Sequence, residues 1–161
     1  YLLSEHIIEM DIMALQRLAN EIAEGCYEFV LKVLSVTRPV IDELSKHYPL
    51  VLVSNFYGNI ETILADFKLD SYFKSIIESS VVGVRKPDPA IYQLGVDAIA
   101  LTANEVLVVG DSFSKDVVPA KQVGCKVAWL EGKGWGNEEI DHSLPDFVIT
   151  DFIQLSAILL D

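Results

Sequence analysis

The chain has 161 residues, 51% of them hydrophobic and 22% charged, which suits one globular domain and excludes collagen-like and disordered classes. Its 12 Lys and Arg against 24 Asp and Glu give a net charge of −12, which disfavours nucleic-acid backbones and anionic membranes as partners. No apolar run is long enough to cross a membrane, and no signal-peptide pattern is visible, so we expect a cytoplasmic protein. Cys26 and Cys125 lie far apart in apolar surroundings, which predicts two buried thiols rather than a disulfide.

The first third of the chain has the pattern of helices. From Ser4, a candidate N-cap, apolar residues recur at helical spacing, and Gly25 predicts a break between two helices. Thr37-Arg38-Pro39 predicts a stop, followed by a short helix to about Lys46. Because the chain starts with Tyr1 rather than Met and is helical almost at once, we expect it to begin inside a larger protein.

Runs of strand length follow and alternate with helices. Strands are predicted at 50–54, 75–78, 106–109, 126–130 and 147–149. The first and third of these runs are unbroken apolar sequence, which is typical of a strand buried on both faces of a parallel sheet. The alternation predicts a doubly wound α/β sheet, in which ligands bind at the carboxyl ends of the strands.

Turn and cap residues set the ends of the intervening helices. Asp88-Pro89 predicts the start of a helix that ends near Leu101. Gly124 is expected to close another helix, which begins near Asp116 because Pro119 fits a first helical turn. Thr150 is expected to cap the last helix.

Asp111 and Asp116 occupy the two ends of the turn that follows the strand at 106–109. Their carboxylates can converge above the sheet, and hard oxygen ligands of this kind suit Mg²⁺. The alternative is structural, with Asp116 capping the next helix and Asp111 merely ending the strand.

Ser54 and Lys86 are candidate groups for binding an anion. The Ser54 hydroxyl follows a strand directly and, with backbone N–H groups at the start of the next helix, can hold an anionic oxygen. Lys86 precedes Pro87-Asp88-Pro89, whose prolines stiffen the backbone and fix the cation over the same edge. The alternatives are an ordinary N-cap and a solvated surface lysine. A net charge of −12 still allows an anionic ligand, because nearby charges act at contact distance while salt screens distant ones.

Three segments together resemble the haloacid dehalogenase-like hydrolases: Val51-Leu52-Val53-Ser54-Asn55, Arg85-Lys86-Pro87-Asp88-Pro89-Ala90-Ile91-Tyr92, and Val108-Val109-Gly110-Asp111-Ser112 with Asp116. They look like the second, third and fourth motifs of that family, in the same order and strand context. The resemblance implies a Rossmann-like core in which Ser54 and Lys86 hold the transferring phosphoryl group, assisted by Asn55. It also implies that Asp111 and Asp116 hold Mg²⁺.

The family's first motif, an Asp-x-Asp-Gly-Thr run that supplies the nucleophile, has no counterpart in this sequence. The nearest imitation, Ile7 to Asp11, fits the polar face of a helix better. The resemblance therefore implies a helical cap remnant at 1–36 and a core at 37–161 that lacks its central catalytic strand. Because the absent strand would leave open edges on strands 50–54 and 106–110, we expect these strands to pair directly or the chain to form a homo-oligomer.

Two functions follow from these observations. The first is a Mg²⁺-dependent phosphatase that hydrolyses a small phosphorylated metabolite through an aspartyl-phosphate in the intact protein, with this chain inactive or nearly so by itself. The alternative is an inactive remnant that binds Mg²⁺, phosphate or a protein partner. The dehalogenase branch of the family ranks last, because the Gly-Asp-Ser turn with Asp116 is more similar to the phosphatase branch. The sequence does not identify the substrate.

Overall fold

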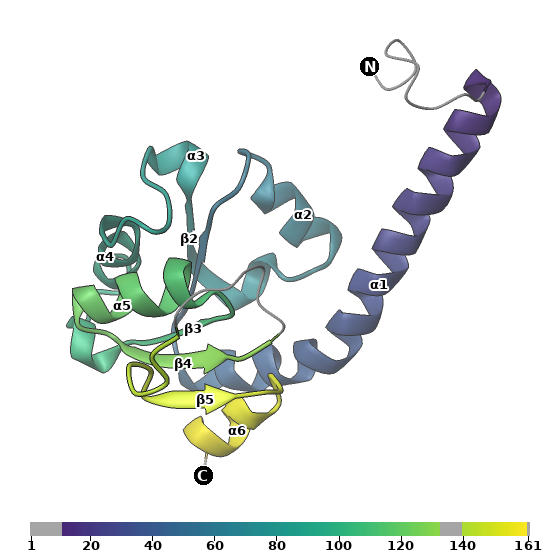
Figure 1. Cartoon of the computed structure of the whole chain (residues 1–161). Helices are drawn as coiled ribbons and strands as arrows, with labels where there is room; N and C mark the ends of the chain where they lie inside the picture. The colour runs from purple at the N-terminus through teal and green to yellow at the C-terminus, as the bar shows by residue number, and fades with distance from the viewer. Residues whose placement is uncertain (1–10, 133–139, 161) are drawn as a thin grey trace. The chain divides into compact units, whose positions relative to one another are not determined.

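The structure is a computed structural model that describes residues 11–132 and 140–160 (Figure 1). The chain divides into two compact units, Tyr1–Pro39 and Val40–Asp161. In the described ranges no helix is long and apolar enough to span a membrane. The predicted cap at Ser4 and most of the Ile7 to Asp11 run lie outside the described residues.

Helix α1 (Ile12–His47) is continuous where two interruptions were predicted. It begins after Asp11, whose Oδ1 accepts a hydrogen bond from the Ala14 N–H at 2.7 Å. The predicted break at Gly25 and the predicted stop at Thr37–Pro39 are both wrong, because the helix runs through both positions. A proline removes one helical hydrogen bond without ending a helix whose following turns are anchored. Val40 and Leu44, just beyond Pro39, are both buried.

The part of α1 in the first unit presents a largely exposed apolar surface. Its exposed large apolar residues are Ile12, Met13, Leu18, Ile22, Tyr27, Phe29, Leu31, Val33 and Val36. Cys26 is also exposed, whereas Cys125 is buried. The expectation of two buried thiols is therefore wrong for Cys26, whose apolar neighbours in the sequence are themselves exposed.

The described residues of the second unit form five parallel strands in two sheets. Strands β1 (Leu50–Ser54) and β2 (Phe73–Glu78) form one sheet. Strands β3 (Leu107–Gly110), β4 (Lys126–Leu130) and β5 (Phe147–Ile149) form the other, in that order. Each strand lies where an apolar run predicted it, with small shifts at the ends.

Short helices connect these strands: α2 (Ile60–Asp66), α3 (Ser79–Val82), α4 (Ala90–Asp97), α5 (Val118–Val123) and α6 (Gln154–Leu159), with 3₁₀ turns η1 (Asp70–Tyr72) and η2 (Ala103–Glu105) and a π-helical turn η3 (Phe113–Val117). The N-cap of α4 is Pro89 rather than the predicted Asp88, so the helix begins one residue later than expected, although Asp88 Oδ1 accepts a hydrogen bond from the Ala90 N–H. As predicted, Gly124 closes α5 in the left-handed conformation. Helix α4 ends at Asp97, earlier than the predicted Leu101. Thr150 does not cap α6; its N–H instead donates to the side chain of Gln154.

Two apolar clusters show that helices cover both faces of the strands, as predicted for a doubly wound fold. The first cluster joins α4, η3 and α5 to β4, and Val53 of β1 and Val108 of β3 pack against it. The second joins the last turns of α1 to β4, β5 and α6, and Leu50 of β1 and Leu107 of β3 pack against that one. The two sheets therefore share both cores.

Despite these shared cores, β1 and β3 are not hydrogen-bonded to each other in the described chain, which rules out the direct pairing offered as one expectation. All of β1 is only partly buried, and Val109 of β3 is 37% exposed. Both strands are less buried than predicted: their faces contact the two apolar clusters, but each is an edge strand with one unpaired backbone edge. We call these the inner edges of β1 and β3.

Candidate functional site

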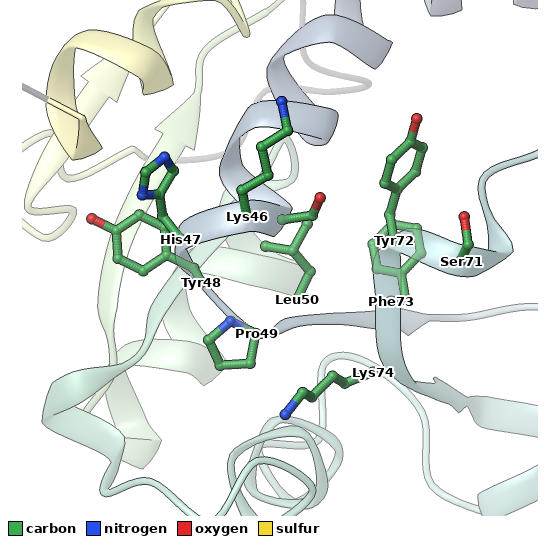
Figure 2. A pocket seen from close by; sticks show the side chains of 10 residues that line it. Lys46, His47, Tyr48, Pro49, Leu50, Ser71, Tyr72, Phe73 and Lys74 are labelled. Carbon is green, nitrogen blue, oxygen red and sulfur yellow. The ribbon is translucent and has the colours of Figure 1, made fainter.

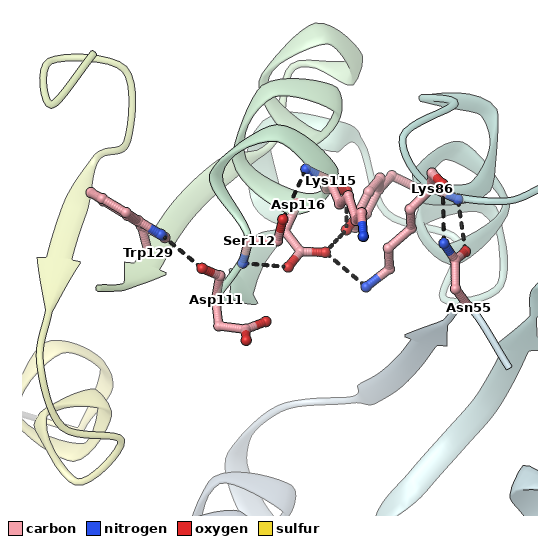
Figure 3. A network of polar contacts seen from close by, with 8 residues as sticks. Asn55, Lys86, Asp111, Ser112, Lys115, Asp116 and Trp129 are labelled. Carbon is pink, nitrogen blue, oxygen red and sulfur yellow. Dashed lines mark hydrogen bonds and ion pairs between the residues drawn. The ribbon is translucent and has the colours of Figure 1, made fainter. Parts of the chain in front are cut away.

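The segments that follow β1, β2 and β3 place three of the predicted site residues in contact (Figure 3). Asn55 comes directly after β1, and its side-chain amide pairs with the backbone of Lys86 in both directions. Asn55 Nδ2 donates to the Lys86 carbonyl at 3.0 Å, and the Lys86 N–H donates to Asn55 Oδ1 at 2.8 Å. Asn55 therefore fixes the backbone from which the Lys86 side chain extends.

The Lys86 ammonium reaches the turn after β3 and forms an ion pair there. Its Nζ lies 2.8 Å from Asp116 Oδ1, with side chains 18% and 5% exposed, respectively. Asp116 Oδ2 accepts a hydrogen bond from the Ser112 N–H at 3.0 Å. A buried carboxylate is costly without such partners, so this pairing both neutralises Asp116 and holds Lys86 in place.

Gly110 makes the approach of Asp116 to the end of β3 possible. A Cβ atom at position 110 would lie 2.4 Å from the Cβ of Asp116, far closer than real Cβ contacts. The turn itself is fixed by Ser112, whose side chain accepts a hydrogen bond from the Lys115 N–H. The Gly-Asp-Ser segment is therefore a close-packed turn, and glycine is required at its first position.

Tyr92 belongs to the same network, although the sequence analysis assigned it no role. Only 4% exposed, it has its hydroxyl 2.6 Å from Asp116 Oδ1 and 3.2 Å from the Lys115 carbonyl. Burial, and then the negative charge of Asp116, raise the pKa of Tyr92, so the hydroxyl keeps its proton and donates. The available signal was a tyrosine among the apolar positions of a helix, because a buried hydroxyl needs a partner.

Asp111 differs from Asp116 in having an exposed carboxylate. Its backbone carbonyl accepts a hydrogen bond from Trp129 Nε1 at 3.1 Å. Among residues 11–132 and 140–160, its carboxylate has no hydrogen-bond or ion-pair partner, and Figure 3 shows it without a contact. This carboxylate is available to a ligand.

Ser54 ends β1 beside Glu78 of β2 and is half-buried. It is not the cap of the next helix, because α2 begins at Ile60 with Asn59 as its N-cap. The predicted combination of a hydroxyl with an immediately adjacent helix start is therefore not formed. In the described part of the chain the Ser54 hydroxyl has no hydrogen-bond partner, so it can donate to a ligand.

Glu78 is a second residue that the sequence analysis missed. It is 4% exposed, and its Oε1 accepts hydrogen bonds from the Gly58 N–H and from Ser80 Oγ. Next to it, Ser79 Oγ accepts a hydrogen bond from the Phe56 N–H at 3.1 Å. These contacts fasten the loop after β1 to the segment after β2. The sequence showed only an acid at the end of an apolar strand, a position that most often faces solvent.

The donor set fits a magnesium ion that retains water ligands. Asp111 offers a carboxylate without partners, and Asp116 Oδ2 has one hydrogen bond and so keeps a free acceptor position. Mg²⁺ is commonly bound by one or two carboxylates and several waters. Within the described ranges, no group of three or more His, Cys, Asp or Glu side chains forms an all-protein metal cage.

A separate pocket of about 440 Å³ lies at the opposite ends of β1 and β2 (Figure 2). It is bounded by Leu50 and Phe73, the first residues of these strands, and by Lys46, Tyr72 and Lys74. None of the candidate site residues lines it. The candidate site is therefore the group at the carboxyl ends, Ser54, Asn55, Lys86, Asp111 and Asp116, which we call the carboxyl-edge site.

Comparison with known proteins identifies relatives of the chain. Residues 4–130 match the family model described as haloacid dehalogenase-like hydrolase. A phosphoglycolate phosphatase of Pectobacterium atrosepticum is 35% identical over 128 residues, which is 78% of this chain and 54% of that protein. A glyceraldehyde 3-phosphate phosphatase of Pyrococcus furiosus is 31% identical over 93 residues, covering 57% of this chain and 39% of that protein.

The fold has relatives among solved structures. A HAD phosphatase from Thermococcus onnurineus superposes with a TM-score of 0.67 at 28% identity, over 75% of this chain and 55% of that one. This chain spans about half the length of the curated relatives it matches.

Proposed function

Because the chain belongs to the haloacid dehalogenase-like hydrolases, we propose that the carboxyl-edge site binds Mg²⁺ and the phosphoryl group of a small phosphorylated metabolite. The observation that supports this most directly is the convergence of Asn55, Lys86 and Asp116 from three separate segments. A positioned ammonium, a free hydroxyl and a free carboxylate then occupy one edge of the fold. These are the groups that a phosphate dianion and a divalent cation need together.

Each residue has a distinct role in this proposal. Lys86 Nζ donates to a phosphoryl oxygen while it remains paired with Asp116, since an ammonium has three N–H donors. The Ser54 hydroxyl orients a second phosphoryl oxygen, and Asn55 holds the Lys86 backbone. Asp111 and Asp116 hold Mg²⁺. When bound, the ion neutralises phosphoryl charge and so stabilises the transition state of phosphoryl transfer.

Hydrolysis requires a nucleophile that these five residues do not provide. We propose that in a whole protein an aspartate of the family's first motif attacks phosphorus and displaces the substrate alcohol, which is protonated as it leaves. Water then attacks the aspartyl-phosphate, releases inorganic phosphate and regenerates the carboxylate. The chain by itself is expected to bind phosphate without hydrolysing phosphomonoesters.

Calorimetric titration of the 161-residue chain with inorganic phosphate, with and without Mg²⁺, tests the binding site. We expect the chain to bind phosphate, and to bind it more tightly with Mg²⁺. Asp111→Asn should lose Mg²⁺ binding. Lys86→Ala should bind phosphate at least tenfold more weakly, which corresponds to about 1.4 kcal/mol. Lys74→Ala is the matched control, because Lys74 is an exposed lysine at the opposite ends of the strands. Equal phosphate affinity in Lys86→Ala and the wild type would refute the assignment.

The catalytic part of the proposal needs the first motif. Adding a segment with an Asp-x-Asp-Gly-Thr run should produce Mg²⁺-dependent hydrolysis of p-nitrophenyl phosphate, and Asp111→Asn should abolish it. An unchanged rate in that variant would reject the role of Asp111. Binding without hydrolysis in the completed protein would favour the second candidate, an inactive binding protein.

A further inference from the structure

Tyr92 contacts both members of the Lys86–Asp116 ion pair. Its hydroxyl lies 2.6 Å from Asp116 Oδ1, and its ring centroid lies 5.6 Å from Lys86 Nζ. Asp116 Oδ1 thus receives the tyrosine hydroxyl and the lysine ammonium together. A cation over an aromatic face is attracted by the ring, so Tyr92 holds Lys86 from a second direction.

The shared oxygen has a consequence for Lys86. A carboxylate oxygen has about two acceptor positions, and on Asp116 Oδ1 the hydroxyl of Tyr92 occupies one of them. The Lys86 ammonium therefore cannot use both positions, and it keeps N–H donors that point away from Asp116. Without the hydroxyl, both acceptor positions on Asp116 Oδ1 would be open to the ammonium, which could then be drawn further into the ion pair.

We propose that Tyr92 is a positioning residue for phosphate binding: its hydroxyl holds Asp116 and its ring supports Lys86, so that the ammonium presents its remaining donors to a phosphoryl oxygen. This inference rests on the proposed function for its ligand. The positioning role itself rests on the contacts of Tyr92. The phosphate site and the positioning role can therefore be tested separately.

Tyr92→Phe isolates the hydroxyl, because it keeps the buried ring and the contact with Lys86. Loss of one hydrogen bond to a charged group predicts a phosphate affinity about five- to tenfold weaker in the calorimetric titration with Mg²⁺. Tyr48→Phe is the matched control, since the Tyr48 hydroxyl also makes a 2.6 Å hydrogen bond, to the Leu159 carbonyl, outside the site. The control is expected to leave phosphate affinity within twofold of the wild type.

A purely structural role would lower the melting temperature of both variants and leave both phosphate affinities unchanged, which would overturn the proposal.

A second measurement uses the chain without phosphate and follows the NMR signals of the Ser112 amide and the Lys86 ε-methylene protons. The proposal expects Tyr92→Phe to shift both signals and Tyr48→Phe to shift neither. If the wild type fails to bind phosphate, the proposed function fails. The NMR comparison then decides the positioning role, and unshifted signals in Tyr92→Phe would overturn it.

Discussion

At the scale of single residues, the site depends on how closely Asp116 approaches the backbone of Gly110. A Cβ at position 110 would overlap with three side-chain atoms of Asp116, at 2.4 to 2.7 Å, and neither the strand end nor the buried acid has room to move. The missing side chain of one residue therefore sets the position of another residue's carboxylate.

Gly110→Ala should destabilise the protein by about 1–3 kcal/mol, as overpacking does, and should weaken Mg²⁺ binding because Asp116 is displaced. Urea unfolding and calorimetry measure the two effects. Gly25→Ala is the control, since a Cβ there meets nothing within 4 Å and the residue lies inside α1. Replacing a helical glycine by alanine should stabilise by about 0.5–1 kcal/mol. Equal effects of the two substitutions would contradict the close-packing argument.

At the scale of elements, Asp146 joins α5 to β4. Its Oδ2 lies 2.8 Å from Lys121 Nζ in α5 and 2.8 Å from the backbone N of Val127 in β4. Burial favours the neutral acid, but the hydrogen bonds from Lys121 and Val127 outweigh burial, and the pKa of Asp146 lies below its usual value.

This lowered pKa predicts a loss of stability in acid. A carboxyl group whose pKa is lower in the folded state stabilises the fold above its unfolded pKa of about 3.9, and that contribution disappears as the pH falls through the folded value. Urea unfolding between pH 2 and 6 should therefore show that acidification lowers the free energy of unfolding less in Asp146→Asn than in the wild type. The asparagine keeps an acceptor for the Val127 N–H but cannot titrate. Lys121→Gln should also reduce this loss of unfolding free energy, because the hydrogen bond from Lys121 helps to lower the pKa of Asp146. If the wild type and both variants lose the same unfolding free energy on acidification, Asp146 contributes nothing to the loss.

At the scale of the whole molecule, the main feature is a pair of sheets that share two apolar cores without sharing a hydrogen bond within the described residues. The inner edges of β1 and β3 carry unpaired backbone groups, and strand edges of this kind favour pairing with another chain. We expect the chain to self-associate through these edges.

Sedimentation equilibrium should show an average mass that rises with protein concentration. A charge on the edge should oppose association, so Val109→Lys in β3 is expected to lower that mass. Val81→Lys, at an exposed position of α3 away from both inner edges, is the control. A monomer at every concentration would contradict the prediction. Loss of association in Phe29→Glu alone would place the interface on the exposed apolar surface of α1 instead.

Local sequence patterns were enough to predict the strands and to select polar residues for the candidate site. Apolar runs predicted the five strands of the described residues, Gly124 predicted the end of α5, and the polar residues after β1 and β3 indicated the edge that carries the candidate site. These features depend on contacts within a few residues, which a pattern of side chains can record. The resemblance of the chain to the haloacid dehalogenase-like hydrolases is confirmed by the family model that matches residues 4–130.

The residues that hold these groups in place come from distant parts of the chain, and they were found from the three-dimensional contacts. Tyr92 lies 24 positions from Asp116, and Glu78 lies 20 from Gly58, so no local pattern predicts either contact. The continuity of α1 through Pro39 likewise depends on Val40 and Leu44 being buried beyond it. The division of the strands into two sheets was decided at the same level, because an apolar run predicts a strand but not which neighbour pairs with its edges.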